Sequence, residues 1–290
     1  MLDGVTTPPD PGETIAAAWS RVASEQLRAT RAAAIAVRHD VRAEQGPPRL
    51  REFHTNMAAL HRTMQGRHQA AVALHSMYAR RLQNWQDDRR AGAPPLFMSA
   101  VATISGSGSA LITLREAEME ALVATSDRTA ETAHDLESTF GEGPTRDTTA
   151  ECRPIAVRGD ALEQRWPLYG PMVRDLGVRS IVAAPLRVSK HCFGALTVFH
   201  REMVAALPLG PSLDDVADAL THTVLLTNQL PLFEDADCQS VVNHAAGIVA
   251  QRYGCTAGDA LALIRACAFT RDERIATVAA RVARGELIIE

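Results

Sequence analysis

The C-terminal end of the chain is rich in arginines suited to contact with phosphates. There are six of them, and the candidates for RNA contact are Arg252, Arg265, Arg271 and Arg274. A guanidinium can hold a phosphate through two hydrogen bonds or stack on a base. Ala245 and Gly247 come just before them, and such small residues would let a partner approach closely. The alternative is that the arginines form a solvated face paired with nearby acids.

The middle of the chain holds a second set of candidate residues, suited to binding a small molecule. A ligand pocket combines an apolar wall with a few convergent polar groups. The residues that could form one are Glu142, Trp166, Tyr169, Arg187 and Cys192. Trp166 and Tyr169 stand three residues apart, a spacing that is also typical of core packing on a short helix. The ligand itself, and any cofactor, stays unknown.

The five cysteines have neither the spacing of a disulfide framework nor that of a zinc site, because no C-x-x-C pair occurs. We therefore expect a reducing, cytoplasmic environment. Cys152 and Cys192 would sense redox state if they were thiolates near Arg153 or His191. The alternative is a pair of inert, partly buried thiols.

Four histidines, His54, His61, His68 and His75, recur every seventh residue. On a helix, successive members lie about 10.5 Å apart, too far for two of them to hold one metal ion. We therefore predict no metal site. Either histidine merely occupies a position beside an apolar seam, or the ladder is neutral near pH 7 and becomes charged below about pH 6.5.

Catalytic motifs are missing from the sequence. It contains no P-loop, G-x-S-x-G or H-E-x-x-H, which predicts a protein that is not an enzyme. No apolar run approaches the roughly 18 residues of a membrane span, so no membrane contact is expected. Residues 91–237 carry 11 basic and 20 acidic side chains and would repel RNA, so any RNA contact should lie nearer the ends of the chain.

Two long helices should begin the chain after a disordered lead-in at residues 1–12. Helical periodicity runs through 13–45 and a heptad pattern through 50–88, and Pro47 and Pro48 separate them. The region 13–95 is thus predicted to be a helical hairpin. Its apolar seam, which includes Leu50, Phe53 and Leu60, favours a homodimer.

In the rest of the chain, strand patterns replace the long helical periodicity, which predicts an α+β fold. Strand patterns fall at 109–114, 118–124, 155–157, 178–188 and 192–200. Without regular alternation of strand and helix, they indicate a largely antiparallel sheet in a domain at 96–211. A linker helix at 212–234 should follow, and then a module at 235–290 with helices near 235–252, 257–268 and 272–284.

The C-terminal module resembles the ANTAR family. The family's motif is met by Ala245, Gly247, Ile248, Gly254, Cys255, Thr256, Asp259, Ala260, Leu263, Ile264, Arg265, Ala268, Ile275, Val278 and Ala279. Three positions depart from it: Ala246 replaces the usual lysine, Asp272 the usual asparagine, and Glu273 stands where a basic residue is common. A lost cation weakens phosphate binding, so restoring lysine at position 246 is expected to strengthen binding if that face of the helix meets the RNA.

The domain at 96–211 resembles GAF domains, particularly those fused to ANTAR modules. The resemblance rests on LESTFGEGPTRD at 136–147, the following RPIAV, the segment RWPLYGPMVRDLGVRS, and the paired strands IVAAPLRV and FGALTVFHR. Together the two resemblances imply a signal-responsive regulator of transcription antitermination. The ANTAR module would bind tandem stem-loops in nascent messenger RNA as a homodimer, and the GAF-like domain would sense a ligand. The alternative is a dimeric sensory scaffold that acts by protein contact through a degenerate ANTAR module.

Overall fold

The computed structural model describes residues 11–88, 95–116, 119–188, 191–203, 212–225, 237–271, 273 and 275–289. The predicted disordered lead-in at 1–12 lies outside these residues, apart from its last two, which belong to the first helix. The chain divides into two compact units, Met1–Leu96 and Phe97–Glu290.

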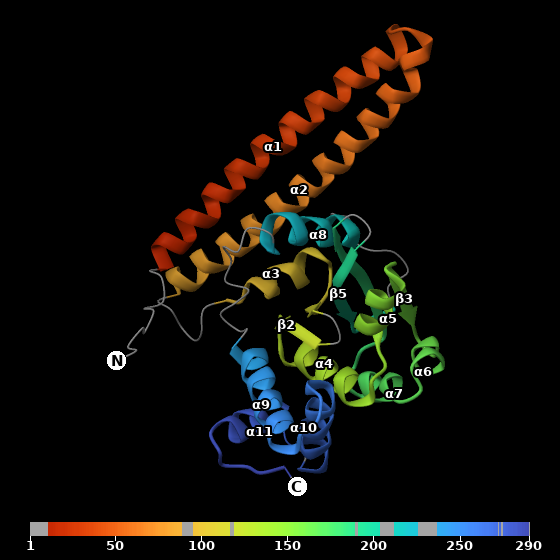
Figure 1. Cartoon of the computed structure of the whole chain (residues 1–290). Coiled ribbons are helices and arrows are strands. Elements are labelled where there is room, and N and C mark those ends of the chain that lie inside the picture. The colour runs from red at the N-terminus through yellow and green to blue at the C-terminus, as the bar shows by residue number, and fades with distance from the viewer. Residues whose placement is uncertain are drawn as a thin grey trace. The chain divides into compact units, whose positions relative to one another are not determined.

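Two long antiparallel helices make up the first unit (Figure 1). Helix α1 spans Pro11–Gln45 and α2 spans Arg51–Asp87, with the short 3-10 turn η1 at Pro48–Leu50 between them. Both predicted helices are confirmed. Many of the side chains buried between them are small, and the buried alanines are Ala18, Ala29, Ala32, Ala36, Ala58, Ala70, Ala71 and Ala79. Neither these helices nor any other in the described part of the chain is long and apolar enough to cross a membrane.

The histidines of α2 turn toward α1. His54 Nδ1 lies 2.9 Å from Nδ1 of His39 on α1, and His68 Nδ1 lies 2.6 Å from the buried carboxylate of Glu25. His75 is 2% exposed, so it belongs to the buried part of the unit. In the part of the chain that the structure describes, no group of three or more His, Cys, Asp or Glu residues could hold a metal ion.

The apolar seam of α2 is buried along only part of its length. Ala71, Leu74 and Tyr78 are buried, whereas Phe53 and Leu60 are exposed at 55% and 52%. The exposed portion begins at the turn between the helices. The seam predicted from the heptads therefore leaves apolar surface on this unit.

A five-stranded antiparallel sheet in the order β2-β1-β5-β4-β3 organises the second unit. The strands are β1 (Ser109–Glu116), β2 (Met119–Thr125), β3 (Ile155–Arg158), β4 (Ser180–Val188) and β5 (His191–His200). The predicted α+β class with a largely antiparallel sheet is confirmed. A register shift between Leu186 and Arg187 places a bulge near the start of β5.

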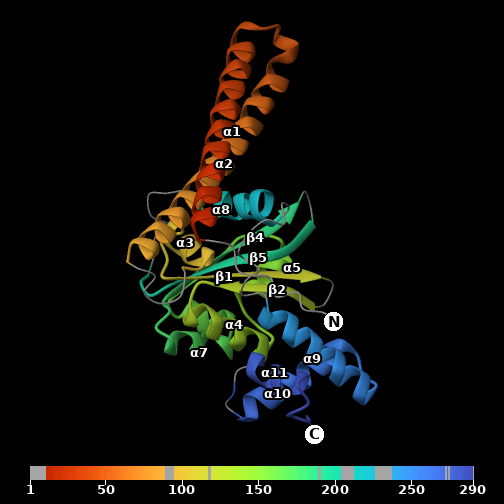
Figure 2. The same ribbon diagram turned by 90° about the vertical axis from the view of Figure 1, so that its left-hand side faces the viewer.

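Helices cover both faces of the sheet (Figure 2). Helices α3 (Phe97–Ile104) and α8 (Leu213–Ala219) lie on one side, and α4 (Arg128–Phe140) and α7 (Tyr169–Asp175) on the other. Helix α5 (Pro144–Glu151) packs against β5 and β4, α6 (Ala161–Arg165) precedes α7, and a π-helical segment, Leu220–Leu225, continues α8. Inward side chains such as Ile181 and Phe199 pack with Trp166 and Tyr169 in one core.

Three helices form the C-terminal module: α9 (Asp237–Tyr253), α10 (Ala257–Arg271) and α11 (Ile275–Ala283). Gly254 ends α9 in a left-handed conformation, with φ 64°. The hydroxyl of Thr256 accepts the N–H of Asp259 at 3.1 Å, while the Asp259 carboxylate accepts the N–H of Thr256 at 3.2 Å. These reciprocal hydrogen bonds begin α10. The Thr256 hydroxyl also donates to the Asp259 carboxylate at 2.7 Å, and this bond, together with the N–H of Thr256, lowers the pKa of Asp259.

Candidate functional site

The arginines of the C-terminal module differ in whether an acid neutralises them. Arg281 Nη1 lies 2.8 and 2.9 Å from the two carboxylate oxygens of Glu273, and Arg284 donates two hydrogen bonds to Glu286 at 2.7 and 3.0 Å. Arg281 and Arg284 therefore agree with the alternative in which the arginines are paired with nearby acids.

Two of the predicted RNA-contacting arginines have no such partner. Arg252 and Arg271 are exposed at the last turns of α9 and α10, and neither forms an ion pair with a described residue. Arg265 is half-buried on α10, and Arg274 lies outside the described residues. Among the described residues, no carboxylate pairs with the charges of Arg252 and Arg271.

Gly247 lies exposed in the middle of α9, in line with the exposed His244 and Gln251. A Cβ built on Gly247 would meet no atom within 4 Å. Glycine inside a helix costs about 1 kcal/mol relative to alanine, and packing against the described residues gives no reason for that cost. A close approach by an external partner would give one.

Ala245 and Ala246 are fully buried, unlike Gly247. Both belong to the core of the C-terminal module, together with Val249 and Val278. Ala245 therefore packs inside the module and offers no surface to RNA. A lysine at position 246 would have to leave that core, so the surface position on which the expected gain from Ala246→Lys depends is absent.

In the sheet-containing domain, the Glu142 carboxylate caps a helix. Its Oε1 accepts the backbone N–H groups of Leu168 and Tyr169, at 2.5 and 2.8 Å, where α7 begins. These N–H groups have no partner within α7 itself. Glu142 therefore positions the segment that carries two of the other predicted ligand-binding residues.

Trp166 and Tyr169 are core residues. They are 1% and 0% exposed, and their rings meet edge to face with centroids 5.8 Å apart. Burial, with the nearby Glu137, raises the pKa of Tyr169 well above its ordinary value. The alternative that Trp166 and Tyr169 pack in the core therefore agrees with their burial.

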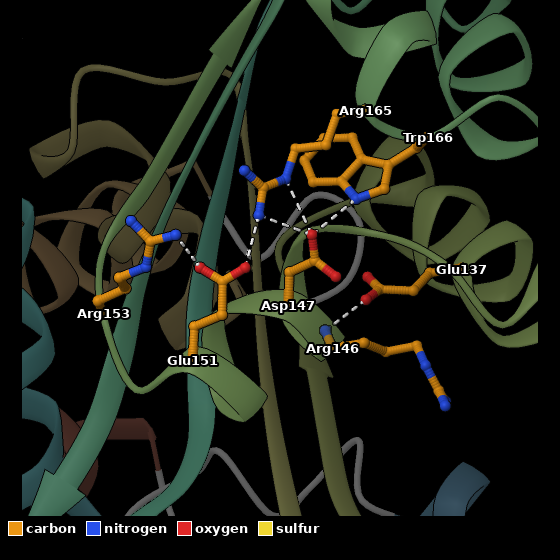
Figure 3. A network of polar contacts seen from close by, with 7 residues as sticks. All are labelled: Glu137, Arg146, Asp147, Glu151, Arg153, Arg165 and Trp166. Carbon is orange, nitrogen blue, oxygen red and sulfur yellow. Dashed lines mark hydrogen bonds and ion pairs between the residues drawn. The ribbon is translucent and has the colours of Figure 1, made fainter.

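An ion-pair network along α5 links the Trp166 side chain to the end of that helix (Figure 3). Asp147 Oδ2 accepts the indole N–H of Trp166 at 3.1 Å and lies 2.8 Å from Arg165 Nη2. The same guanidinium reaches Glu151 at 2.9 Å, which also binds Arg153 at 2.6 Å. Glu137 Oε1 accepts the backbone N–H of Arg146 at 2.7 Å, so α4 is tied to the first turn of α5.

Arg187 and Cys192, the remaining predicted ligand-binding residues, face each other across the bulge between β4 and β5. Arg187 is exposed and Cys192 is half-buried. Cys192 Sγ donates to the carbonyl of Gly194 at 3.3 Å, and burial raises the pKa of its thiol to about 11. The five predicted residues therefore lie in two groups, Glu142, Trp166 and Tyr169 in one and Arg187 and Cys192 in the other.

Comparison with known families decides the identity of both regions. Residues 11–224 match the model of the GAF domain, and residues 234–282 match that of the ANTAR domain. The chain belongs to the GAF domain family. The ANTAR domain behind it gives the GAF-ANTAR architecture of antitermination regulators, as the sequence motifs predicted. No curated protein matches the chain.

The GAF match begins earlier than residue 96, where we placed the start of the GAF-like domain, and it spans the helical hairpin as well. GAF and ANTAR domains are regulatory and non-catalytic, which fits the expectation that the protein is not an enzyme.

Sequence reasoning missed a set of buried hydroxyl groups in the GAF domain. These hydroxyls have no hydrogen-bond partner among the described residues, and they belong to Thr113, Ser138, Thr148 and Tyr169. They come from β1, α4, α5 and α7, the strand and helices around the core. The signal available in the sequence was a threonine at an inward position of a strand, Thr113 between Ile112 and Leu114.

Proposed function

We propose that this protein is a signal-responsive, RNA-binding regulator of transcription antitermination that works in the cytoplasm. In this proposal the ANTAR domain binds tandem stem-loops in nascent messenger RNA and the GAF domain receives the signal. The observation that carries the proposal is the pair of exposed arginines Arg252 and Arg271, which have no acidic partner among the described residues, in a module whose Arg281 and Arg284 are neutralised.

Electrostatics supports this choice of residues. Phosphate contacts release counterions from RNA, and a guanidinium already paired with a carboxylate contributes less to that release. Gly247 supplies the second support, because its exposed position on α9 allows an RNA backbone to come close. Tandem stem-loops require two ANTAR domains, hence a homodimer.

The interior of the GAF domain supports a small-molecule signal. Buried hydroxyls without a protein partner are costly unless another group satisfies them. The cap formed by Glu142 and the network of Asp147 with Arg165 hold the surrounding helices in place. The proposed ligand would be a small polar molecule that hydrogen-bonds to these hydroxyls.

A second candidate function is a dimeric scaffold that acts through protein contacts. The observation favouring it is the presence of large exposed apolar side chains on the ANTAR domain, Leu263 at 38% and Ile288 at 51%. Glu273 adds little to this alternative, because its charge is neutralised by Arg281.

Titration of the full-length protein with a two-stem-loop RNA tests the proposal. Arg252→Ala and Arg271→Ala should each weaken binding about tenfold, equivalent to about 1.4 kcal/mol, and reduce the slope of affinity against salt by about one. Arg284→Ala is the matched control, because its charge is already held by Glu286. Equal affinities for all three variants and the unaltered protein would favour the scaffold.

A further inference from the structure

Two imidazoles from different helices face each other toward the end of the helical hairpin that carries the turn between α1 and α2 (Figure 1). Nδ1 of His39 on α1 lies 2.9 Å from Nδ1 of His54 on α2. The ring centroids are 5.1 Å apart, little more than the nitrogen separation plus the two ring radii, so the nitrogens approach almost in line. At this distance one nitrogen must carry a hydrogen and the other must accept it. An N–H···N hydrogen bond therefore joins the two helices.

The pair can take up one proton without losing this bond. A neutral imidazole carries one hydrogen, so the accepting ring has its own on Nε2. The donating ring can bind a proton on its free Nε2 and still donate through Nδ1, which makes the bond charge-assisted. A second proton has only the accepting Nδ1 to bind. It would set two N–H groups and two positive charges against each other across 2.9 Å, so the rings would have to separate.

The charges that act on His39 come from basic groups on both helices. Partial burial lowers the pKa of His39, and the neighbouring basic groups lower it further; they belong to His54, Arg42, His61 and Arg38. The carboxylate of Asp40, the next residue on α1, is paired with Arg62 of α2. A doubly protonated pair therefore gains no unpaired carboxylate from these groups.

Two further rings pack against the pair. His61 stacks on His39 with centroids 6.0 Å apart, and its own Nδ1 is buried without a hydrogen-bond partner among the described residues. The ring of Phe53 meets those of His39 and His54 edge to face, at 6.3 and 5.2 Å. Phe53 belongs to the exposed part of the α2 seam. Separation of the two imidazoles would therefore disturb that apolar surface.

We propose that His39 and His54 form a proton-operated latch between α1 and α2, which stays closed with one bound proton and opens with the second. Opening is confined to the turn end of the hairpin. The next contact of this kind, 2.6 Å between His68 and the buried Glu25, pairs an imidazole with a carboxylate and is strengthened by protonation. The histidines at every seventh position thus respond differently to acid, and the inference does not depend on RNA binding.

Nuclear magnetic resonance of the full-length protein with ¹⁵N-labelled histidine tests the hydrogen bond. We expect a scalar coupling between the two Nδ1 nuclei at pH 7, which persists when the pair binds its first proton and disappears with the second. Two interacting groups of this kind titrate in two separate steps.

Amide hydrogen exchange of the full-length protein, corrected for its intrinsic pH dependence, tests the opening. The open form takes up one proton more than the closed form. Below about pH 6.5, the ordinary pKa of histidine, exchange near the turn should therefore accelerate about tenfold per pH unit. Peptides around the buried Leu74, toward the other end of the hairpin, give the reference for unfolding of the whole unit and should not follow this acceleration.

Variants separate the latch from simple repulsion between cations. His54→Gln and His39→Gln each keep a side chain that can hydrogen-bond to the remaining imidazole but takes up no proton, so the turn end should stay closed in acid. His61→Gln is the matched control, because it removes a stacked titratable ring without touching the bond, and acid should still open this variant. Equal protection by all three variants would overturn the latch in favour of repulsion. Absence of the coupling at pH 7, or opening that persists in both His54→Gln and His39→Gln, would also overturn it.

Discussion

At the scale of single residues, replacing Gly247 should change the stability of the ANTAR domain and its RNA binding in opposite directions. Because a Cβ at this position meets no atom within 4 Å, Gly247→Ala should fit the folded ANTAR domain. It should raise the free energy of unfolding by about 1 kcal/mol, since alanine is the better helix former. The added methyl group should nevertheless weaken binding of two-stem-loop RNA, because it keeps the RNA away from α9. Urea unfolding and RNA titration measure the two effects.

Gly258→Ala is the matched control for this variant. Gly258 is also exposed, and a Cβ there meets only Thr256 Oγ1, at 3.7 Å. It lies in the first turn of α10, away from the exposed line of His244, Gly247 and Gln251. Its replacement should leave RNA affinity unchanged. If Gly247→Ala binds RNA as well as the unaltered protein does, this face of α9 is not an RNA contact.

Tyr169 gives a second prediction at this scale. Its buried hydroxyl has no hydrogen-bond partner among the described residues. Removing an unsatisfied polar group relieves a cost of about 1–3 kcal/mol, so Tyr169→Phe should keep or increase the free energy of unfolding. Tyr78→Phe provides the contrast, because the buried Tyr78 is not among the described residues whose hydroxyl lacks a partner, and its variant should lose stability. A destabilised Tyr169→Phe protein in urea unfolding would show that the hydroxyl is already satisfied.

The residues of the candidate site were predicted unevenly from sequence. Positions such as Arg252 and Gly247 could be named, because charge and small size are properties of the residue itself. Ala245 was misplaced because the sequence does not say which face of α9 meets the other two helices, and burial decides whether a small residue is a contact or core. Glu142 was identified as polar and important, but its two backbone partners on α7 come from a loop geometry that no local pattern encodes.

At the scale of elements, the cap on α7 can be removed without disturbing its core. Glu142→Ala leaves the N–H groups of Leu168 and Tyr169 without their acceptor and should lower the free energy of unfolding by about 1 kcal/mol. Glu142→Gln keeps an acceptor oxygen and should recover most of that loss. Chemical denaturation of the three proteins side by side checks this. Equal losses for both variants would assign the effect to the negative charge of Glu142 and not to its hydrogen bonds.

The helical hairpin should lose stability in acid through His75. Burial, with Arg21 adding to it and Glu25 opposing it, lowers the pKa of His75 from 6.5 to about 4. Below pH 6.5 the unfolded chain takes up a proton that folded His75 refuses, so stability present at neutral pH is lost as the pH falls toward about 4. The shift corresponds to about 3 kcal/mol at most.

Replacement of His75 checks the pH dependence. Unfolding free energies measured from pH 7 to 4 should fall less steeply for His75→Gln than for the unaltered protein. The exposed His191 serves as control, and His191→Gln should leave the slope unaltered. Parallel slopes for the His75→Gln and unaltered proteins would rule out His75 as the source of acid sensitivity.

The elements were easier to predict than their packing. Alternating apolar residues identified all five strands, and the two prolines at 47 and 48 located the turn between α1 and α2. The π-helical segment Leu220–Leu225 was not predicted, because its widened turn changes the backbone without changing the apolar pattern. The heptads of α2 marked an apolar seam correctly, but periodicity could not tell its buried part at Ala71–Tyr78 from its exposed part at Phe53–Leu60.

At the scale of the whole molecule, the proposed function requires two ANTAR domains on one RNA, and the exposed seam of α2 is the surface we expect to bring two chains together. Leu50, Phe53 and Leu60 are 41%, 55% and 52% exposed. Burying each such side chain contributes about 1.5–3 kcal/mol. We therefore expect a homodimer at tens of micromolar protein in light scattering.

The double variant Phe53→Glu with Leu60→Glu should convert that dimer into a monomer, because a symmetric interface would bring like charges together. Met203→Glu changes a still more exposed apolar side chain of the second unit and should leave the dimer intact. A monomeric unaltered protein would contradict the expectation at once.

The loss of the dimer should affect binding of tandem stem-loops but not of single ones. The monomeric variant should bind a single stem-loop as tightly as the dimer does, but its affinity for the tandem pair should fall about 10²-fold or more, because the second contact is no longer intramolecular. Equal losses for single and tandem stem-loops would place α2 in the RNA contact itself instead of in the dimer interface.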